Sequence, residues 1–203
     1  MEFNKIIEKL CLESEFAHNN YVPIIRDESA EFLYNYVKNN NIKTVLEIGT
    51  AIGYSGSIII GAGVQSLTTI EIKKEYFEIA KKTFEKMGFQ ENVTMFLGDA
   101  KNILKELCDK NEKYDMIFLD GAKGQYIYYL PMLKKLLNDE AVIFADNVLL
   151  HGLVEGEDYV PHKKRTMVVN LRKYLKVINE DPYETELIRL EDGIAITKIK
   201  GEN

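Results

Sequence analysis

Short apolar runs alternate with longer amphipathic segments along most of this chain. Five of the runs are bounded by polar residues or glycine, which is typical of strands buried in a parallel sheet. They cover residues 44–48, 67–70, 93–97, 116–119 and 141–145. After the second run, apolar residues recur at helical spacing from Ile72 to Met87, and Gly88 is a suitable C-cap. The pattern therefore predicts five alternating strand–helix units.

The two ends of the chain depart from that alternation. The first forty residues show helical spacing, with a break at residues 21–23 and a second helix over 27–38. Near the other end, two strands over 183–190 and 194–199 flank an Asp-Gly turn, which is a strong hairpin signal. We therefore expect a doubly wound α/β fold: a Rossmann-like, seven-stranded mixed sheet with N-terminal helices and a C-terminal antiparallel hairpin.

Length and composition bound the class of protein. With 203 residues the chain can build one good-sized core, so we expect a single domain made of a helical segment (1–40) and a Rossmann-like core (41–203). No stretch approaches the ~20 apolar residues of a membrane span, and the N-terminus lacks the features of a signal peptide. A cytoplasmic location is therefore expected. Cys11 and Cys108 have no metal-ligand pattern nearby and receive no function.

Charge is distributed unevenly. The formal net charge of −6 argues against a protein that coats nucleic acid, yet residues 161–176 contain six basic residues and no acid. These are Lys163, Lys164, Arg165, Arg172, Lys173 and Lys176. The segment reads as a helix whose basic face is either ordinary solvated surface or a ridge that attracts a polyanion locally.

Two of the predicted strands end in carboxylates. Asp120 follows the run 116–119, and Asp146 and Asn147 follow the run 141–145, with room for one crossover helix between them. Such a unit has parallel neighbouring strands, so both acids should emerge at the same edge of the sheet. Two carboxylates and an amide carbonyl are hard oxygen donors, which favours Mg²⁺, with Mn²⁺ or Ca²⁺ as alternatives. His18, His151 and His162 are too scattered for a second metal site, and His151 is left unassigned.

The turn after the first strand suits a small cofactor. Gly49 and Gly53 allow a tight turn and a close approach of backbone to ligand, although their spacing is not the dinucleotide fingerprint. Glu47, expected inside the turn region, would repel phosphate and suits a cationic amino group. Glu71 at the end of the second strand could accept hydrogen bonds from ribose hydroxyls, and Asp99 ends the third strand near an adenine. Taken singly, each of these residues has a purely structural alternative. The two glycines could be plain turn residues, Glu71 a charge at a helix N-terminus, and Asp99 an N-cap.

Together these motifs resemble a known family. Glu-x-Gly-x-x-x-Gly-Tyr-Ser, Thr-Ile-Glu and Gly-Asp-Ala resemble the class I S-adenosylmethionine-dependent methyltransferases. With Phe-Leu-Asp-Gly-Ala-Lys-Gly-Gln-Tyr and Ala-Asp-Asn-Val added, residues 21–199 resemble the metal-dependent O-methyltransferases that include catechol and caffeoyl-CoA enzymes. The resemblance implies a cofactor site of Ile25, Glu47, Gly49, Ser55, Glu71, Asp99, Ala100 and Asp120. It implies a metal site of Asp120, Asp146 and Asn147.

The chemistry implied is methyl transfer to an ionised hydroxyl. A bound dication lowers the pKa of a coordinated hydroxyl, and the same positive field favours the neutral amine of Lys123. That amine could take the hydroxyl proton, and the resemblance implies this role, so we expect Lys123 and Asp120 as the catalytic pair. The plain alternative for Lys123 is a surface lysine in a loop.

The acceptor should carry vicinal oxygens, because a metal with two adjacent open positions selects for them. Catechols qualify, and so does 5-hydroxyuracil. The basic segment favours RNA, and residues 146–166 with Ala-Lys-Gly-Gln-Tyr resemble the bacterial tRNA 5-hydroxyuridine methyltransferases of this family. That resemblance implies methylation of wobble 5-hydroxyuridine in the tRNA anticodon loop to 5-methoxyuridine. From the basic segment itself we expect RNA contacts by Lys163, Lys164, Arg165, Arg172 and Lys176.

Two alternatives stay open at this point. One is an O-methyltransferase acting on a small catechol or phenolic substrate, and the other is a non-catalytic nucleotide-binding module that keeps the fold. Members of this family are often dimers, so the resemblance also implies a homodimer, with the N-terminal helices as plausible contacts.

Overall fold

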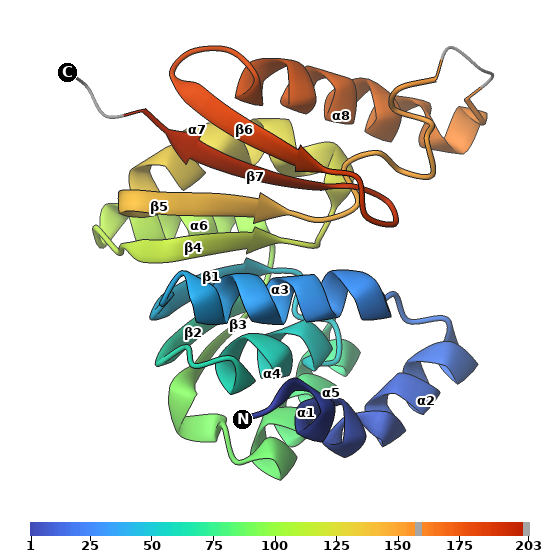
Figure 1. Ribbon diagram of the computed structural model, residues 1–203, viewed down its shortest axis with the longest axis vertical. Helices are drawn as coiled ribbons and strands as arrows, with labels where there is room; N and C mark the ends of the chain where they lie inside the picture. The colour runs from blue at the N-terminus through green and yellow to red at the C-terminus, as the bar shows by residue number, and fades with distance from the viewer. Residues whose placement is uncertain (157–159, 201–203) are drawn as a thin grey trace. The chain divides into compact units, whose positions relative to one another are not determined.

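The computed structural model describes residues 1–156 and 160–200, and Figure 1 shows its helices and strands. The chain divides into two compact units, Met1–Ile103 and Leu104–Asn203, which are described here one at a time. The prediction of one single domain stays a prediction.

Three helices open the first unit and three parallel strands form its sheet. Its elements are α1 (Phe3–Lys9), α2 (Cys11–Asn20), α3 (Asp27–Asn39), β1 (Thr44–Ile48), α4 (Tyr54–Gly61), β2 (Ser66–Glu71), α5 (Lys74–Met87), the 3-10 turn η1 (Gln90–Asn92) and β3 (Val93–Leu97). The strand order is β3-β2-β1, with Ile48 opposite Ile70 and Ile70 opposite Phe96. This register brings the carboxyl ends of all three strands to one edge, as the apolar runs predicted.

The second unit combines one parallel strand pair with an antiparallel hairpin. After α6 (Ala100–Asp109), which crosses the division, come β4 (Tyr114–Leu119), η2 (Lys123–Gln125), α7 (Tyr126–Leu136), β5 (Leu137–Ala145), η3 (His162–Lys164), α8 (Arg165–Ile178), β6 (Tyr183–Ile188) and β7 (Ile194–Ile199). β4 and β5 pair in parallel, whereas β7 pairs antiparallel with both β5 and β6. The seven strands of mixed direction and the terminal hairpin confirm the predicted fold class.

Each unit buries its own apolar side chains. In the first unit every residue of α4 is buried, and α1 packs so closely on it that a Cβ on Gly61 would lie 2.3 Å from Ile6 Cδ1. In the second unit the rings of Phe118 on β4 and Phe144 on β5 are 5.6 Å apart. These cores hold the strands rigidly, so the positions of the residues at the strand ends are well defined.

The boundaries differ from the predictions in a few places. Ile72, expected in a helix, lies before α5 and is 66% exposed. The reason is local, because the carboxylate of Glu71 accepts a hydrogen bond from the Lys73 N–H (2.8 Å) and holds a turn that delays the helix to Lys74. β5 begins at Leu137, four residues earlier than the apolar run at 141 indicated, and the predicted helix over residues 1–20 is two helices, α1 and α2.

Candidate functional site

The ends of β4 and β5 place two carboxylates at one edge of the second unit. Leu119 lies opposite Ala145, so Asp120 and Asp146 follow at equivalent positions. The Leu119 carbonyl oxygen accepts hydrogen bonds from the Asp146 N–H (3.0 Å) and from the Tyr126 hydroxyl (2.9 Å). These two bonds tie the strand ends and α7 together at the position where both acids emerge.

Asp146 is a buried carboxylate, and one of its two oxygens has no hydrogen-bond partner. The residue is 1% exposed, and its Oδ1 accepts a hydrogen bond from the Asn147 N–H (2.8 Å). Its Oδ2 is buried and has no hydrogen-bond partner. Burial, reinforced by the negative charge of Asp120, raises the pKa of Asp146 to about 7. A buried carboxylate oxygen left unpaired is costly, so this atom marks a place where a positive charge would be stabilised.

Asp120 pairs with Lys123. Lys123 Nζ donates a hydrogen bond to Asp120 Oδ1 over 3.1 Å, and both side chains are largely shielded from solvent. Burial raises the pKa of Asp120, and the ammonium of Lys123 opposes that rise. The structure therefore brings together the proposed base, one proposed ligand and, through the Leu119 carbonyl, the second proposed ligand.

Helix α8 holds the turn that carries Lys123. The buried Asn170 Nδ2 donates a hydrogen bond to the Gly124 carbonyl (2.8 Å), and a Cβ on Gly124 would lie 3.5 Å from Met167 Cα. Sequence reasoning missed Asn170 and Tyr126. The available signal for Asn170 was an amide placed between Val168 and Leu171, in the apolar stripe of an otherwise basic helix.

The donor set fits a hard divalent ion. Asn147 follows Asp146 directly and has a left-handed backbone (φ 53°), which is tolerated by asparagine. Among the described residues no three His, Cys, Asp or Glu side chains gather as a metal site. The candidate set instead combines two carboxylates with an amide, which suits Mg²⁺ because Mg²⁺ takes few protein ligands and keeps several waters.

Glu47 lies at the centre of the candidate cofactor residues in the first unit. Our expectation that it sits in the turn was wrong: it belongs to β1 and is 0% exposed, because the strand continues to Ile48. Its Oε1 accepts a hydrogen bond from Ser55 Oγ (2.5 Å), and its Oε2 accepts one from Thr69 Oγ1 (2.6 Å). The carboxylate is thus held by hydroxyl groups from α4 and β2.

The turn between β1 and α4 brings backbone amides to the strand ends. Gly49 and Gly53 have positive φ values of 105° and 82°. A Cβ on Gly53 would lie 3.3 Å from the backbone of Ala80, so the turn packs closely on α5. The N–H groups of Gly49 and Thr50 both donate to the Ile70 carbonyl (3.0 and 3.2 Å), which fixes the turn against the end of β2.

The other cofactor candidates lie at neighbouring element ends. The Glu71 carboxylate accepts hydrogen bonds from the N–H groups of Ala51 and Lys73, each 2.8 Å long. The backbone carbonyl of Glu71 accepts a third from the Gly98 N–H (2.8 Å). Asp99 is exposed, and its Oδ1 accepts a hydrogen bond from the Lys101 N–H (2.8 Å), as an N-terminal cap of α6 would. Two further candidates flank helices: Ile25 is buried just before α3, and Ala100 begins α6.

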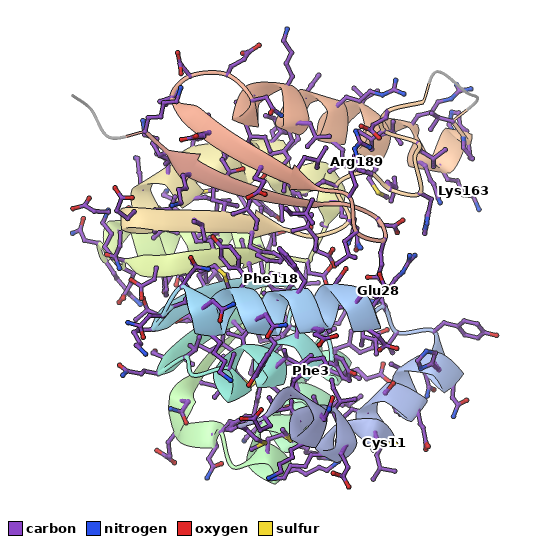
Figure 2. All side chains as sticks on the ribbon, in the orientation of Figure 1. Phe3, Cys11, Glu28, Phe118, Lys163 and Arg189 are labelled. Atoms are coloured by element: carbon purple, nitrogen blue, oxygen red, sulfur yellow. The ribbon has the colours of Figure 1, made fainter. Side chains whose placement is uncertain are left out.

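The basic segment is partly engaged in holding a loop. Arg172 donates hydrogen bonds to the carbonyls of Val154 (2.8 Å), Leu153 (3.2 Å) and Gly156 (2.6 Å), and Arg165 Nε donates to Val160 (3.3 Å). Arg189 adds a two-pronged ion pair with Glu155 (2.8 and 2.9 Å). These arginines therefore have structural roles that the sequence did not reveal. Lys163, Lys173 and Lys176 are exposed, and Lys163 is labelled near the start of α8 in Figure 2.

The fold and the two groups of residues define a class: an α/β protein with candidate cofactor residues around the turn after its first strand and candidate oxygen ligands after its fourth and fifth. Comparison with known protein families identifies the family of this chain. A family model described as O-methyltransferase matches residues 3–200, so this chain belongs to the O-methyltransferase family. The predicted class of enzyme, an S-adenosylmethionine-dependent O-methyltransferase, is thereby confirmed.

Individual proteins similar to this chain are also O-methyltransferases by name. A caffeoyl-CoA O-methyltransferase of Medicago sativa is 31% identical over 183 residues, which cover 84% of this chain and 72% of that protein. The catechol O-methyltransferase of Bos taurus is 28% identical over 177 residues, covering 84% and 63% respectively. A solved Staphylococcus aureus structure, described provisionally as a caffeoyl-CoA O-methyltransferase, is 33% identical with a TM-score of 0.85, covering 96% of this chain and 92% of that one. Within the described ranges, no helix has the length and apolar character needed to cross a membrane.

Proposed function

We propose that this protein transfers a methyl group from S-adenosylmethionine to one of two vicinal oxygens on an acceptor, with a divalent ion held by Asp120, Asp146 and Asn147. The observation that carries the proposal is the buried Oδ2 of Asp146, which has no partner although a second carboxylate lies at the neighbouring strand end. A bound cation would satisfy that oxygen and relieve the repulsion between the two acids.

The second unit would perform the proton chemistry. When bound, Mg²⁺ would supply the positive charge that lowers the pKa of an acceptor hydroxyl. Lys123 Nζ would take the hydroxyl proton, and its bond to Asp120 Oδ1 keeps the amine beside one of the proposed ligands. Asn170 and Tyr126 would position these groups through the Gly124 and Leu119 carbonyls.

The first unit would bind the methyl donor. When bound, S-adenosylmethionine would supply a methyl group on a positively charged sulfur. Glu47, organised by Ser55 and Thr69, would attract the cationic amino group, and Glu71 would accept hydrogen bonds from the ribose hydroxyls. Gly49, Asp99, Ala100 and Ile25 would complete the site. Asp120 is proposed to contribute to the cofactor site as well as to the metal.

A catechol-type acceptor is the better-supported substrate. The relatives described above are named for catechol and caffeoyl-CoA, and both names imply a phenolic acceptor. A metal coordinated by three protein oxygens leaves adjacent positions that two neighbouring oxygens of one ring can occupy. Arg172 belongs to the basic segment that favoured RNA, but it donates hydrogen bonds to loop carbonyls. This engagement weakens the argument for an RNA substrate.

Wobble 5-hydroxyuridine in tRNA remains a second candidate because of one observation. Lys163, Lys173 and Lys176 are exposed on a segment without acidic residues, which would attract phosphates. The homodimer and the identity of the metal are also predictions. Size-exclusion chromatography with light scattering would test whether the protein is a homodimer.

A direct assay separates these substrates. Full-length protein is incubated with S-adenosylmethionine, Mg²⁺ and either a 3,4-dihydroxyphenyl compound, its monohydroxy analogue, or tRNA containing 5-hydroxyuridine. We expect methylation of the dihydroxy compound, none of the monohydroxy analogue, and loss of activity with EDTA. Methylation of tRNA alone would select the second candidate, and equal methylation of both phenols would contradict the metal-chelation proposal.

A further inference from the structure

A cavity in the first unit is open to solvent and borders the candidate cofactor residues, because its lining residue Tyr54 directly precedes Ser55. It has a volume of about 470 Å³, within the roughly 300–1,000 Å³ typical of ligand pockets. Its walls come from four helices of the first unit, α1, α2, α3 and α4, which are labelled in Figure 1. The lining residues are Ile7, Glu8, Cys11, Ser14, Glu15, His18, Asn19, Asp27 and Tyr54. None of these is a residue proposed above for cofactor or metal.

The charges around this cavity have one sign. Glu8, Glu15 and Asp27 line it from three different helices, and the described lining includes no Lys or Arg. His18 adds a polar group whose Nδ1 is hydrogen-bonded to the Ser14 carbonyl (2.8 Å). Since a carbonyl only accepts, Nδ1 donates in this hydrogen bond. The cavity therefore repels anions and offers acceptors to cations.

Tyr54 provides an independent indication of a ligand. The residue is 3% exposed, yet within the described structure its hydroxyl makes no hydrogen bond. The hydroxyl is not completely sealed, because it is not among the solvent-inaccessible side-chain atoms that lack a partner. Burial and the charges of Asp27 and Cys11, both lining residues, raise the pKa of Tyr54, so its oxygen end lies toward the cavity. Because the hydroxyl reaches the cavity and has no protein partner among the described residues, it can hydrogen-bond to a polar group bound there.

From this arrangement we propose that the cavity between α1, α2, α3 and α4 binds an aliphatic compound with two or more ammonium groups. Three exposed carboxylates on separate helices attract a ligand with more than one positive charge, and the Tyr54 hydroxyl can accept a hydrogen bond from an ammonium. Ile7 and the Tyr54 ring give the methylene chain an apolar surface. A bare metal ion fits less well, because the cavity is far larger than one ion and no three described His, Cys, Asp or Glu residues gather as ligands.

The site does not depend on the proposed methyl transfer, and its test is a binding measurement. Isothermal titration calorimetry of the full-length protein with spermidine, at constant ionic strength, should give saturable binding. The uncharged 1,8-octanediol, of similar length, should not bind. Tyr54→Phe removes only the hydroxyl, and it should weaken spermidine binding about tenfold or more, as expected for a hydrogen bond to a charged group. Asp27→Asn should weaken spermidine binding to a similar extent. If Tyr54→Phe or Asp27→Asn fails to fold, Glu15→Gln, at another lining residue, should weaken binding in the same way.

The control is Glu91→Gln, an exposed acid at the amino end of β3 that does not line the cavity, whereas Tyr54 lies beyond the carboxyl end of β1. Its affinity for spermidine should stay within about twofold of the unmodified chain, because a distant surface charge contributes little once it is screened by salt. The proposal is overturned if spermidine does not bind, if the cavity variants bind as tightly as the unmodified chain, or if Glu91→Gln weakens binding as much as they do. Equal binding of the octanediol would also overturn it.

Discussion

Glu47 in the first unit and Asp146 in the second are both buried carboxylates, but their surroundings differ. Each oxygen of Glu47 accepts a hydrogen bond from a neighbouring hydroxyl. Asp146 has one backbone N–H partner at Oδ1, none at Oδ2 and a second acid nearby. Glu47 is thus organised without a ligand, whereas Asp146 lacks the positive partner that its burial requires.

The difference indicates how the candidate residues of each unit would work. A carboxylate preorganised by hydroxyls can receive a cationic amino group without rearrangement, which suits a cofactor that enters and leaves. A carboxylate with an unsatisfied oxygen next to another acid gains most from a multivalent cation that stays bound. The first unit should therefore be insensitive to metal, and the second should depend on it.

Loss of the metal ligand is the strongest test of this contrast. Asp146→Asn keeps the shape but removes the charge, so methyl transfer should fall to background because the divalent ion is no longer held. Binding of S-adenosylhomocysteine by calorimetry should persist, since Glu47 is untouched. The matched control is Asp139→Asn on the same strand, which is exposed and should leave activity unchanged. Retained activity in Asp146→Asn would contradict the proposed site.

Removal of the proposed base should have the next largest effect. Lys123→Met should lower kcat by about 10²–10⁴-fold, the usual contribution of a general base, without weakening cofactor binding. Raising the pH should partly restore the rate, because hydroxide can then ionise the acceptor. Lys134→Met on α7, an exposed lysine, serves as the control. A kcat for Lys123→Met within twofold of the unmodified enzyme would reassign Lys123 as a loop lysine.

Glu47→Gln tests the other side of the contrast. The amide cannot attract a cationic amino group as a carboxylate does, so affinity for S-adenosylhomocysteine should fall by roughly 10–100-fold, as expected for a hydrogen bond to a charged group. Mn²⁺ affinity measured by electron paramagnetic resonance should be unchanged. A parallel loss of metal affinity would show that the two units are not independent in this respect.

Metal binding should depend on pH in a defined direction. Because the pKa of Asp146 is raised to about 7, its carboxyl is mostly protonated at pH 6 and must lose that proton to bind a cation. Apparent Mn²⁺ affinity should therefore increase by about tenfold from pH 6 to pH 8, with the change centred near pH 7. Asp146→Asn should bind little Mn²⁺ at either pH, and an affinity that is flat with pH in the unmodified chain would count against the assignment.

Two neighbouring tyrosines give the smallest and most finely matched comparison. Tyr126 and Tyr174 are both 0% exposed and pack edge to face, with ring centroids 5.6 Å apart. The Tyr126 hydroxyl donates to the Leu119 carbonyl, whereas the Tyr174 hydroxyl has no partner. In urea unfolding, Tyr126→Phe should therefore cost about 1 kcal/mol, and Tyr174→Phe should cost about zero or be stabilising. The reverse order would contradict the proposed difference between these two hydroxyls.

Features that depend on local sequence were predictable. Short apolar runs ending in Asp120 and Asp146 gave the strand ends, and the Asp-Gly turn gave the hairpin, because each signal lies within a few residues. The order of elements follows from the same runs. The predicted β1 and β3 boundaries, residues 44–48 and 93–97, match the structure.

The contacts that organise the site could not be predicted in the same way, because they join residues far apart in the chain. Thr69 bonds to Glu47 across 22 positions, and Asn170 bonds to the Gly124 carbonyl across 46. The roles of Arg172 were also hidden: a basic residue on an amphipathic helix gives no sign that its guanidinium caps loop carbonyls rather than facing solvent. Such pairings depend on tertiary packing, which periodicity does not report.

The account depends most on a cation at Asp120, Asp146 and Asn147, and crystals grown with Mn²⁺ and S-adenosylhomocysteine test it most directly. Anomalous scattering should show a manganese peak in contact with side-chain oxygens of all three residues, at the roughly 2.0–2.2 Å usual for small hard divalent ions. A structure with the cofactor bound but no peak there, or with manganese held by other residues, would contradict it.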